Sequence, residues 1–374
     1  MDFLPETELN MGKATTRLTV AVLSFILAGH LARAEDNSDC WAGKRRTDLS
    51  TGTIKFECMT EPESRRRFTR LRQLAELGAA GRKDAPYVVE RLGDEDWDVR
   101  VEAARTLGRI GYTDAIPHLL AAITPNDWRL TCEAMVSLIE LKAPQADVVL
   151  KNIAKNYWLP GIAETAQALT EGRPPPESAS IMSFRLTLDI CNAKADQTLV
   201  PICSSPIDDP DAKRHNEETR RYWRRFWRKF RAHPSMDGAR KARLTLDVQD
   251  GKLIGSNHGE WGGELGFIYE KTNETQETII DDNVLGIAER GGHIIVVTGL
   301  DHGGLNRGFI WEVTRAGAGK WSARRLWRLP GTPYETMVGP DGTIGLFGHF
   351  GSVLYRTDDT LQWLACGPYE WCRK

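Results

Sequence analysis

The chain has 374 residues, which predicts about two domains because globular domains usually run ~100–200 residues. Hydrophobic residues make up 41% and charged residues 27%, the balance of a folded protein rather than of a globally disordered one. The formal net charge of −2 argues against a surface built throughout for nucleic acid, because phosphate binding requires a basic face.

The N-terminus has the layout of a secretory signal peptide. An apolar run at residues 18–29 follows two basic residues and precedes a small-x-small sequence at residues 32–34. The run is shorter than the ~20 apolar residues of a spanning helix. Residues 1–34, with Met11 as the probable start, are therefore predicted to be removed on export to the periplasm or the medium. A buried N-terminal helix is the alternative.

The seven cysteines all lie after the predicted cleavage site. In an oxidising compartment, cysteines close in sequence are disulfide candidates, although six cysteines allow 15 pairings. Cys132 lies in an apolar helical stretch and is interpreted as a core residue. Spacing predicts a disulfide-stapled segment at residues 35–64 and two further bridges. The candidate pairs are Cys40 with Cys58, Cys191 with Cys203, and Cys366 with Cys372.

Tryptophans recur about every 31 residues in the first half of the chain, at Trp97, Trp128 and Trp158. Each follows a short acidic or polar turn and is expected to open a helix, because apolar residues come behind it at helical spacing. A second apolar helical stretch follows each of these after a turn. The pattern predicts tandem helix–turn–helix units over residues 65–172.

Residues 103–123, together with the DWDVR sequence at 96–100, resemble HEAT-like repeats. The resemblance covers about residues 65–172 and implies a short α-solenoid whose concave surface holds a protein or peptide. It carries no catalytic residue over to this chain. One helical pair cannot bury its own apolar stripe, so neighbouring pairs are expected to stack.

Residues 173–239 are predicted to be a linker with a partial sheet and a basic-aromatic helix. Prolines 174–176 end the helical array, and residues 182–203 read as strands that would supply a fourth sheet. Every residue from Arg220 to Arg231 is basic or aromatic, with the aromatic rings on one helical face. This helix is expected to lie on an anionic membrane, bind an acidic polymer, or pack its rings on the protein's own sheet. The surface candidates are Arg220, Trp223, Arg224, Phe226, Trp227 and Lys229.

The second half repeats in units of ~45 residues, whose turns begin at Asp250, Gly291 and Asp341. Each unit has an apolar strand, a tight glycine turn, a second apolar strand, a glycine loop with one histidine, a third strand and a more polar fourth strand. The units resemble β-propeller blades over about residues 240–366, although closed propellers have ~4–8 blades and only three are clear. The fold class predicted is therefore α + β multidomain, a short α-solenoid followed by an all-β propeller-like domain at residues 240–374. A β-sandwich is the alternative.

His258, His302 and His349 occupy the same point in the three successive units. If the units converge as propeller blades do, these imidazoles would meet and hold a metal with Asp301 or Glu260. The alternative is that each histidine is hydrogen-bonded within its own loop. No other cofactor is predicted. A ligand-binding mouth on the same face would be lined by Trp261, Asn306, Arg307 and Tyr334.

The chain contains no G-x-S-x-G elbow, H-E-x-x-H, C-x-x-C or phosphate-binding glycine loop. The leading hypothesis is therefore an exported, non-enzymatic binding or scaffold protein that uses its repeat surfaces to hold a protein or peptide, with a glycan as the alternative ligand. Two other functions stay open. One is a cell-envelope hydrolase or lyase with its site in the histidine loops, and the other is a peripheral protein on an anionic membrane. Nucleic acid is disfavoured.

Overall fold

A computed structural model describes part of the chain. The described residues are 42–48, 53–59, 62–173, 228, 230–270, 275–302, 305–316, 320–348 and 350–366. The helices and the three larger sheets belong to one compact unit, whereas the two-stranded hairpin β1 (Ala42–Asp48) and β2 (Thr53–Met59) is divided between that unit and a second. The predicted signal peptide, the strands expected at 182–203 and most of the basic-aromatic helix lie outside the described residues.

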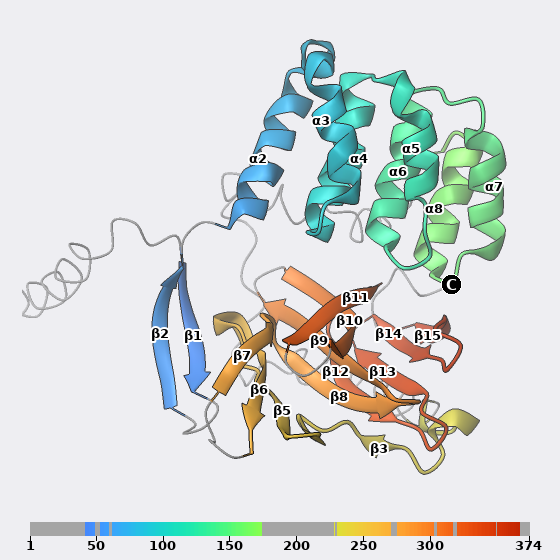
Figure 1. Ribbon diagram of the computed structural model, residues 1–374. Coiled ribbons are helices and arrows are strands. Elements are labelled where there is room, and N and C mark those ends of the chain that lie inside the picture. The colour runs from blue at the N-terminus through green and yellow to red at the C-terminus, as the bar shows by residue number, and fades with distance from the viewer. Residues whose placement is uncertain are drawn as a thin grey trace, which may run out of the picture. The chain divides into compact units, whose positions relative to one another are not determined.

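Residues 62–173 form the predicted array of helical pairs, which Figure 1 shows as a row of neighbouring helices coloured from blue to green. Its helices are α2 (Glu63–Glu76), α3 (Ala85–Glu90), α4 (Trp97–Ile110), α5 (Ile116–Ala122), α6 (Trp128–Glu140), α7 (Ala146–Asn156) and α8 (Pro160–Thr170). Short 3-10 turns, η1 (Gly78–Asp84), η2 (Arg91–Gly93) and η3 (Thr113–Ala115), lie between them. The helical region expected at 65–172 is thus confirmed.

The acidic turns before the tryptophans act as helix N-caps. The Asp96 carboxylate accepts hydrogen bonds from the backbone N–H groups two and three residues on, at 2.8 and 3.4 Å. Asp127 accepts the corresponding bond from Leu130 N at 3.3 Å. Gly111 then ends α4 in the left-handed conformation, with a φ of 67°. The third unit differs, because Pro160 opens α8 and Trp158 therefore precedes its helix.

The core of the array lies between the first helices of successive units. Along α4 and α6 most residues are buried, including Cys132, which agrees with its interpretation as a core residue. One buried ion-pair group joins these two helices, because Arg105 donates to Glu102 at 2.9 Å on its own helix and to Glu133 at 2.7 Å on α6. Both carboxylates share one guanidinium, so the buried negative charge is only partly compensated, and burial raises the pKa of Glu102.

The second half forms three antiparallel sheets, each with four strands in chain order as the units predicted. Sheet I contains β4 (Thr245–Val248), β5 (Gly251–Gly255), β6 (Leu265–Tyr269) and β7 (Thr275–Ile280). Sheet II contains β8 (Val284–Arg290), β9 (His293–His302), β10 (Leu305–Ala316) and β11 (Lys320–Leu329). Sheet III contains β12 (Pro333–Val338), β13 (Ile344–Gly348), β14 (Gly351–Tyr355) and β15 (Leu361–Cys366), with β3 (Arg240–Lys241) added beside β12.

The described sheets do not close into a ring, so the propeller closure expected from the repeats is not seen. Their first strands are joined instead by residues 238–244, the inner segment. Within it, β3 pairs with β12 of sheet III. Ile287 N of sheet II donates to Arg243 O at 2.7 Å, and Gly255 N of sheet I donates to Leu244 O at 2.7 Å. One extended segment therefore hydrogen-bonds to all three sheets.

Arginines also connect sheet II to both of its neighbours. Arg290 donates to Arg356 O at 2.8 Å and lies 4.4 Å above the ring of Tyr355 in sheet III. Arg315 donates to Gln249 O at 3.0 Å and lies 5.2 Å from the ring of Phe267 in sheet I. Within the described ranges, none of the helices is both long and apolar enough to span a membrane.

The inner segment passes so close to β8 at Gly286 that we expect only glycine to fit at this position. A Cβ at this position would lie 2.7 Å from Ala242 Cβ and 2.9 Å from Thr336 Cγ2. We therefore expect Gly286→Ala to lower the free energy of unfolding by about 1–3 kcal/mol, the usual cost of overpacking. Gly93→Ala is the control, because a Cβ there meets nothing within 4 Å. Urea denaturation of both variants checks this, and equal losses would contradict it.

Candidate functional site

The three histidines occupy topologically equivalent positions, each at the hairpin between the second and third strands of its sheet. His258 precedes the turn before β6, where its backbone N–H donates to Asn283 Oδ1 at 3.1 Å. His302 ends β9, where only the backbone is described, and His349 lies outside the described residues. The described part of the chain holds no group of three or more His, Cys, Asp or Glu side chains placed to bind a metal. The metal site remains a prediction without structural support.

The residues predicted to line a ligand-binding mouth instead contact neighbouring strands and links. Tyr334 donates its hydroxyl hydrogen to Asp301 at 2.7 Å. Asn306 Oδ1 accepts from the backbone of the link between sheets II and III at 2.6 Å. Arg307 Nη2 donates to the buried carboxylate of Asp282 at 3.1 Å. These side chains hold successive sheets together, while Trp261 stays partly exposed.

The described end of the basic-aromatic segment packs on the protein itself. Phe230 is buried, with its ring centroid 5.9 Å from that of Phe347 in sheet III, and it shares a small cluster with Met236 and Met337. For this ring, the structure favours packing on the protein's own sheet over exposure to a membrane. The surface candidates Arg220, Trp223, Arg224, Phe226, Trp227 and Lys229 lie outside the described residues.

The predicted disulfides stay predictions. Cys40, Cys191, Cys203 and Cys372 lie outside the described residues. Cys58 lies in β2 and Cys366 in β15, where the structure describes the backbone and not the side chain.

The three repeated tryptophans form one edge of the helical array, the tryptophan edge, and all of them contact the β10–β11 hairpin of sheet II. Trp97 makes an edge-on contact with Phe309 at a centroid distance of 6.2 Å. Trp128 Nε1 donates to the backbone carbonyl of residue 329 at 3.1 Å. Trp158 makes an edge-on contact with Trp327 at 5.9 Å. The repeat in the sequence is therefore a repeat of contacts with one hairpin.

A buried arginine lies at the centre of this junction. Arg328 in β11 is 2% exposed and donates to Asp127 Oδ1 and to Asp98 Oδ1, both at 2.9 Å. Burial raises the pKa of Asp127, and the charge of Arg328 offsets only part of that rise. For Asp98 burial also acts upward, but the charges of Arg328 and Arg129 outweigh it and lower the pKa to about 2. The cost of removing these charges from water offsets part of the attraction between Arg328 and the two carboxylates. The main role of these ion pairs is therefore to fix how the array contacts the hairpin.

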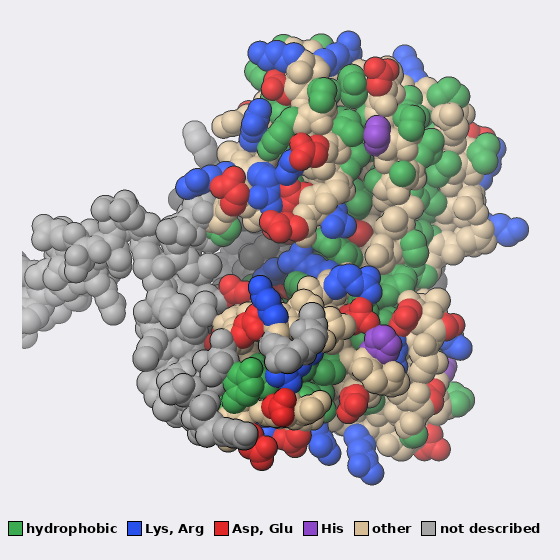
Figure 2. All heavy atoms as spheres, in the orientation of Figure 1, with side chains coloured by type: hydrophobic (Ala, Val, Ile, Leu, Met, Phe, Trp, Pro, Cys, Tyr) green, Lys and Arg blue, Asp and Glu red, His purple; other side chains and the backbone are tan. Residues whose placement is uncertain are grey.

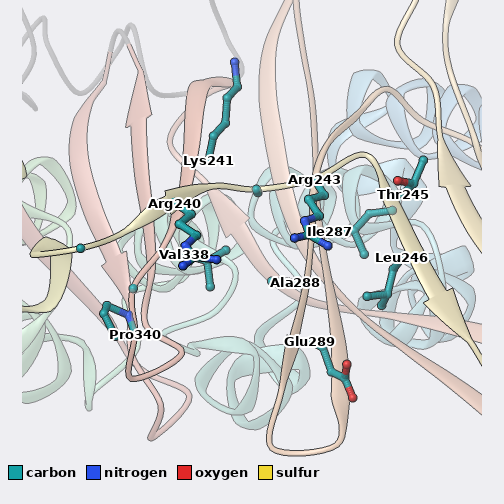
Figure 3. Close-up of a pocket in the computed structure, with 13 residues that line it drawn as sticks. Arg240, Lys241, Arg243, Thr245, Leu246, Ile287, Ala288, Glu289, Val338 and Pro340 are labelled. Atoms are coloured by element: carbon teal, nitrogen blue, oxygen red, sulfur yellow. The ribbon is translucent and has the colours of Figure 1, made fainter.

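A cavity of about 380 Å³ opens where the inner segment meets the first strands of the three sheets; we call it the inner cavity. Figure 3 shows Arg240 and Arg243 pointing to one side of the inner segment and Lys241 pointing to the other. Glu289 of β8 lies at the far wall. Leu246 of β4 is among the apolar residues of the lining, with the side chains of residues 287, 288, 338 and 340.

The inner cavity carries more positive than negative charge. Its lining has three cationic residues, of which Arg240 and Arg243 point to one side of the inner segment and Lys241 to the other, and a single carboxylate, that of Glu289. Lys241 Nζ forms an ion pair with Glu335 at 3.6 Å. Arg240 and Arg243 are exposed and form no ion pair with any residue in the described ranges. Two uncompensated guanidinium groups beside apolar walls suit a ligand that joins a carboxylate or another anion to an apolar group.

Sequence reasoning missed this site. Arg240, Lys241 and Arg243 form a short basic run before the first predicted strand, and such runs are common on protein surfaces. Only the pairing of the inner segment with strands about 45 and 95 residues further along the chain brings the arginines to a cavity. On the face drawn in Figure 2, acidic side chains lie among the basic ones, and several basic side chains gather in a band across the middle of the view.

The helical region matches the family model for HEAT repeats over residues 63–170. This span coincides with α2 to α8, so the helical array is similar to HEAT repeats. No curated protein matches the chain.

Removal of the buried guanidinium at the junction is expected to destabilise the protein strongly. Arg328→Met leaves the Asp127 carboxylate buried without its counter-ion, which usually costs about 3–5 kcal/mol of unfolding free energy. Arg324→Met is the matched control on the same strand, because its exposed ion pair with Glu312 at 2.7 Å is worth at most ~1 kcal/mol. Urea denaturation compares the two variants, and a similar loss in both would show that the buried pair has no special role.

The low pKa of Asp98 predicts that the free energy of unfolding falls as the pH is lowered. A lowered carboxyl pKa gives stability that is present above the unfolded value of ~3.9 and lost as the pH falls toward about 2. We expect Asp98→Asn to lose less stability than the wild type between pH 4 and pH 2, as measured by thermal unfolding across that window. Parallel losses would contradict the role of Asp98.

Proposed function

We propose that this chain is an exported, non-enzymatic binding protein that holds a partner protein at the inner cavity. The observation that carries the proposal is the pair of exposed, uncompensated arginines, Arg240 and Arg243, beside the apolar walls of the cavity. The HEAT repeats support it, because arrays of this kind commonly hold proteins or peptides. Export rests on the signal-peptide pattern at residues 1–34.

The tryptophan edge of the helical array is already occupied by contacts with sheet II. Helical repeats alone would suggest that the partner binds along the array. In this chain Trp97, Trp128 and Trp158 already contact sheet II, and the buried Arg328 fixes the same junction. We therefore assign that edge a scaffolding role and place the partner at the cavity, where Arg240 and Arg243 have no ion-pair partner in the described part of the chain.

The chemistry of the cavity favours binding over catalysis. Its lining contains no His, Cys or Asp, and Glu289 has no second carboxylate opposite it among the lining residues. General acid–base catalysis and nucleophilic catalysis both require a positioned pair of such groups. Arginines with apolar neighbours provide recognition of charge and shape instead.

Site-directed photo-crosslinking tests the proposal. A benzoylphenylalanine in place of Thr245, which lines the cavity and is exposed, is expected to give a light-dependent adduct with one partner protein in the exported fractions of the native cells. The same probe at Val148, which is 70% exposed on α7, is the control and is expected to give no such adduct. The adduct at position 245 should be lost in the Arg240→Ala/Arg243→Ala variant.

Adducts that form only from position 148 would show that the partner binds the helical array and not the inner cavity. Absence of any adduct, together with hydrolysis of a cell-envelope glycan by the purified chain, would replace the proposed function with the hydrolase hypothesis.

A further inference from the structure

The backbone of the inner segment faces two neighbours, β12 of sheet III and β8 of sheet II. It is a regular strand only at Arg240 and Lys241, so strict side-chain alternation ends there. Ala242 N donates to Thr336 O at 2.8 Å, so the backbone groups of Ala242, and of Arg240 two residues earlier, face β12. Arg243 O accepts from Ile287 N, so the backbone groups of residues 243 and 241 face β8. The segment is therefore a shared strand between sheets II and III.

The pairing with β8 ends after a single residue pair. Arg243 and Ile287 form an antiparallel bridge that is isolated from the described strands. Continuation of that register would place Lys241 opposite Glu289, because antiparallel partners run in opposite directions. The bridge is isolated, and Lys241 pairs with Met337 of β12 instead. Lys241 and Glu289 both line the inner cavity and are not paired with each other among the described strands.

Free edge groups of this kind recognise extended peptides. A peptide that enters beside β8 would hydrogen-bond through its main chain to the backbone of Glu289, the mode by which sheet edges capture a strand. The peptide's side chains would then alternate between the two faces of the strand. Arg240 and Arg243 point to the same side of the inner segment and would receive an acidic side chain from there (Figure 3).

The rest of the lining favours a peptide over a small inorganic anion. Leu246, Ile287 and Val338 offer apolar surface that sulfate or phosphate does not use. A volume of about 380 Å³ lies within the ~300–1,000 Å³ range of ligand pockets.

We infer that the inner cavity binds an extended, acidic segment of a partner protein. The carboxylate of that segment lies between Arg240 and Arg243, and its main chain pairs with the free edge of β8 at Glu289. This inference rests on the proposed function and gives the chemistry of the ligand at the same site.

The test uses the full exported chain and a fluorescent capped peptide of sequence Leu-Glu-Val-Glu-Leu, titrated by fluorescence anisotropy. We expect saturable binding that weakens about tenfold or more in Arg240→Ala and in Arg243→Ala, because each loses a charge-assisted hydrogen bond. Lys241→Ala is the matched control, since it removes the same charge from a side chain that points away, and its affinity should stay within about twofold. Thermal unfolding verifies that every variant is folded.

Two peptide variants separate the components of recognition. Replacement of both glutamates by glutamine should abolish most of the binding, and N-methylation of the central peptide bonds should weaken it by a similar factor. Sodium sulfate at matched ionic strength should compete no better than sodium chloride.

Equal weakening by Lys241→Ala and Arg240→Ala, equal affinity of the glutamine peptide, or no peptide binding would overturn the inference. Specific competition by sulfate together with no effect of N-methylation would also overturn it, in favour of a small-anion site. If crosslinks from position 245 persist under any of these outcomes, the proposed function stands and only the acidic-peptide chemistry is wrong. If the crosslinks are absent as well, both fall.

Discussion

The hydrogen bond from Ile287 N to Arg243 O, 2.7 Å long, is part of the constraint on which the sheet domain depends. Each sheet leaves its first strand unpaired on one side, and such edges are exposed to aggregation unless they are covered. The inner segment pairs with β12, forms one bridge to β8 and continues along the chain toward β4. Three sheets are thereby joined although they do not close into a ring. Gly286 permits this because any side chain there would meet Ala242.

A second constraint joins the helices to the sheets. Helix stacking buries the array's own apolar stripes, while the tryptophan edge and Arg328 connect the array to the β10–β11 hairpin. Burial raises the pKa of Asp127 although Arg328 forms an ion pair with it. The aromatic contacts add apolar burial to this junction, and the buried ion pairs fix its geometry. A scaffold held in one orientation presents its binding surface with little entropic cost.

Periodic features could be predicted from the sequence, and features that break the period could not. The spacing of Trp97, Trp128 and Trp158 predicted the helical pairs, and the glycine turns predicted four strands in each unit. Their shared contact with the β10–β11 hairpin could not be predicted. A repeat shows that positions are equivalent, but it does not show which residues they contact. The inner cavity was missed for a related reason. Arg240 and Arg243 line it only because the inner segment pairs with strands far along the sequence.

The site thus lies where the repeat pattern is broken, and there is a physical reason for this. A regular sheet satisfies its backbone groups internally and leaves none to recognise a ligand. At residues 241 and 289 one strand must serve two diverging sheets, and it cannot remain paired with both along its whole length. Lys241 and Glu289 are consequently not paired with each other, and Arg240 and Arg243 at the cavity have no ion-pair partner in the described part of the chain. A ligand that pairs with these groups would complete the hydrogen bonding that joins the sheets, so binding and the stability of the sheet domain should be coupled.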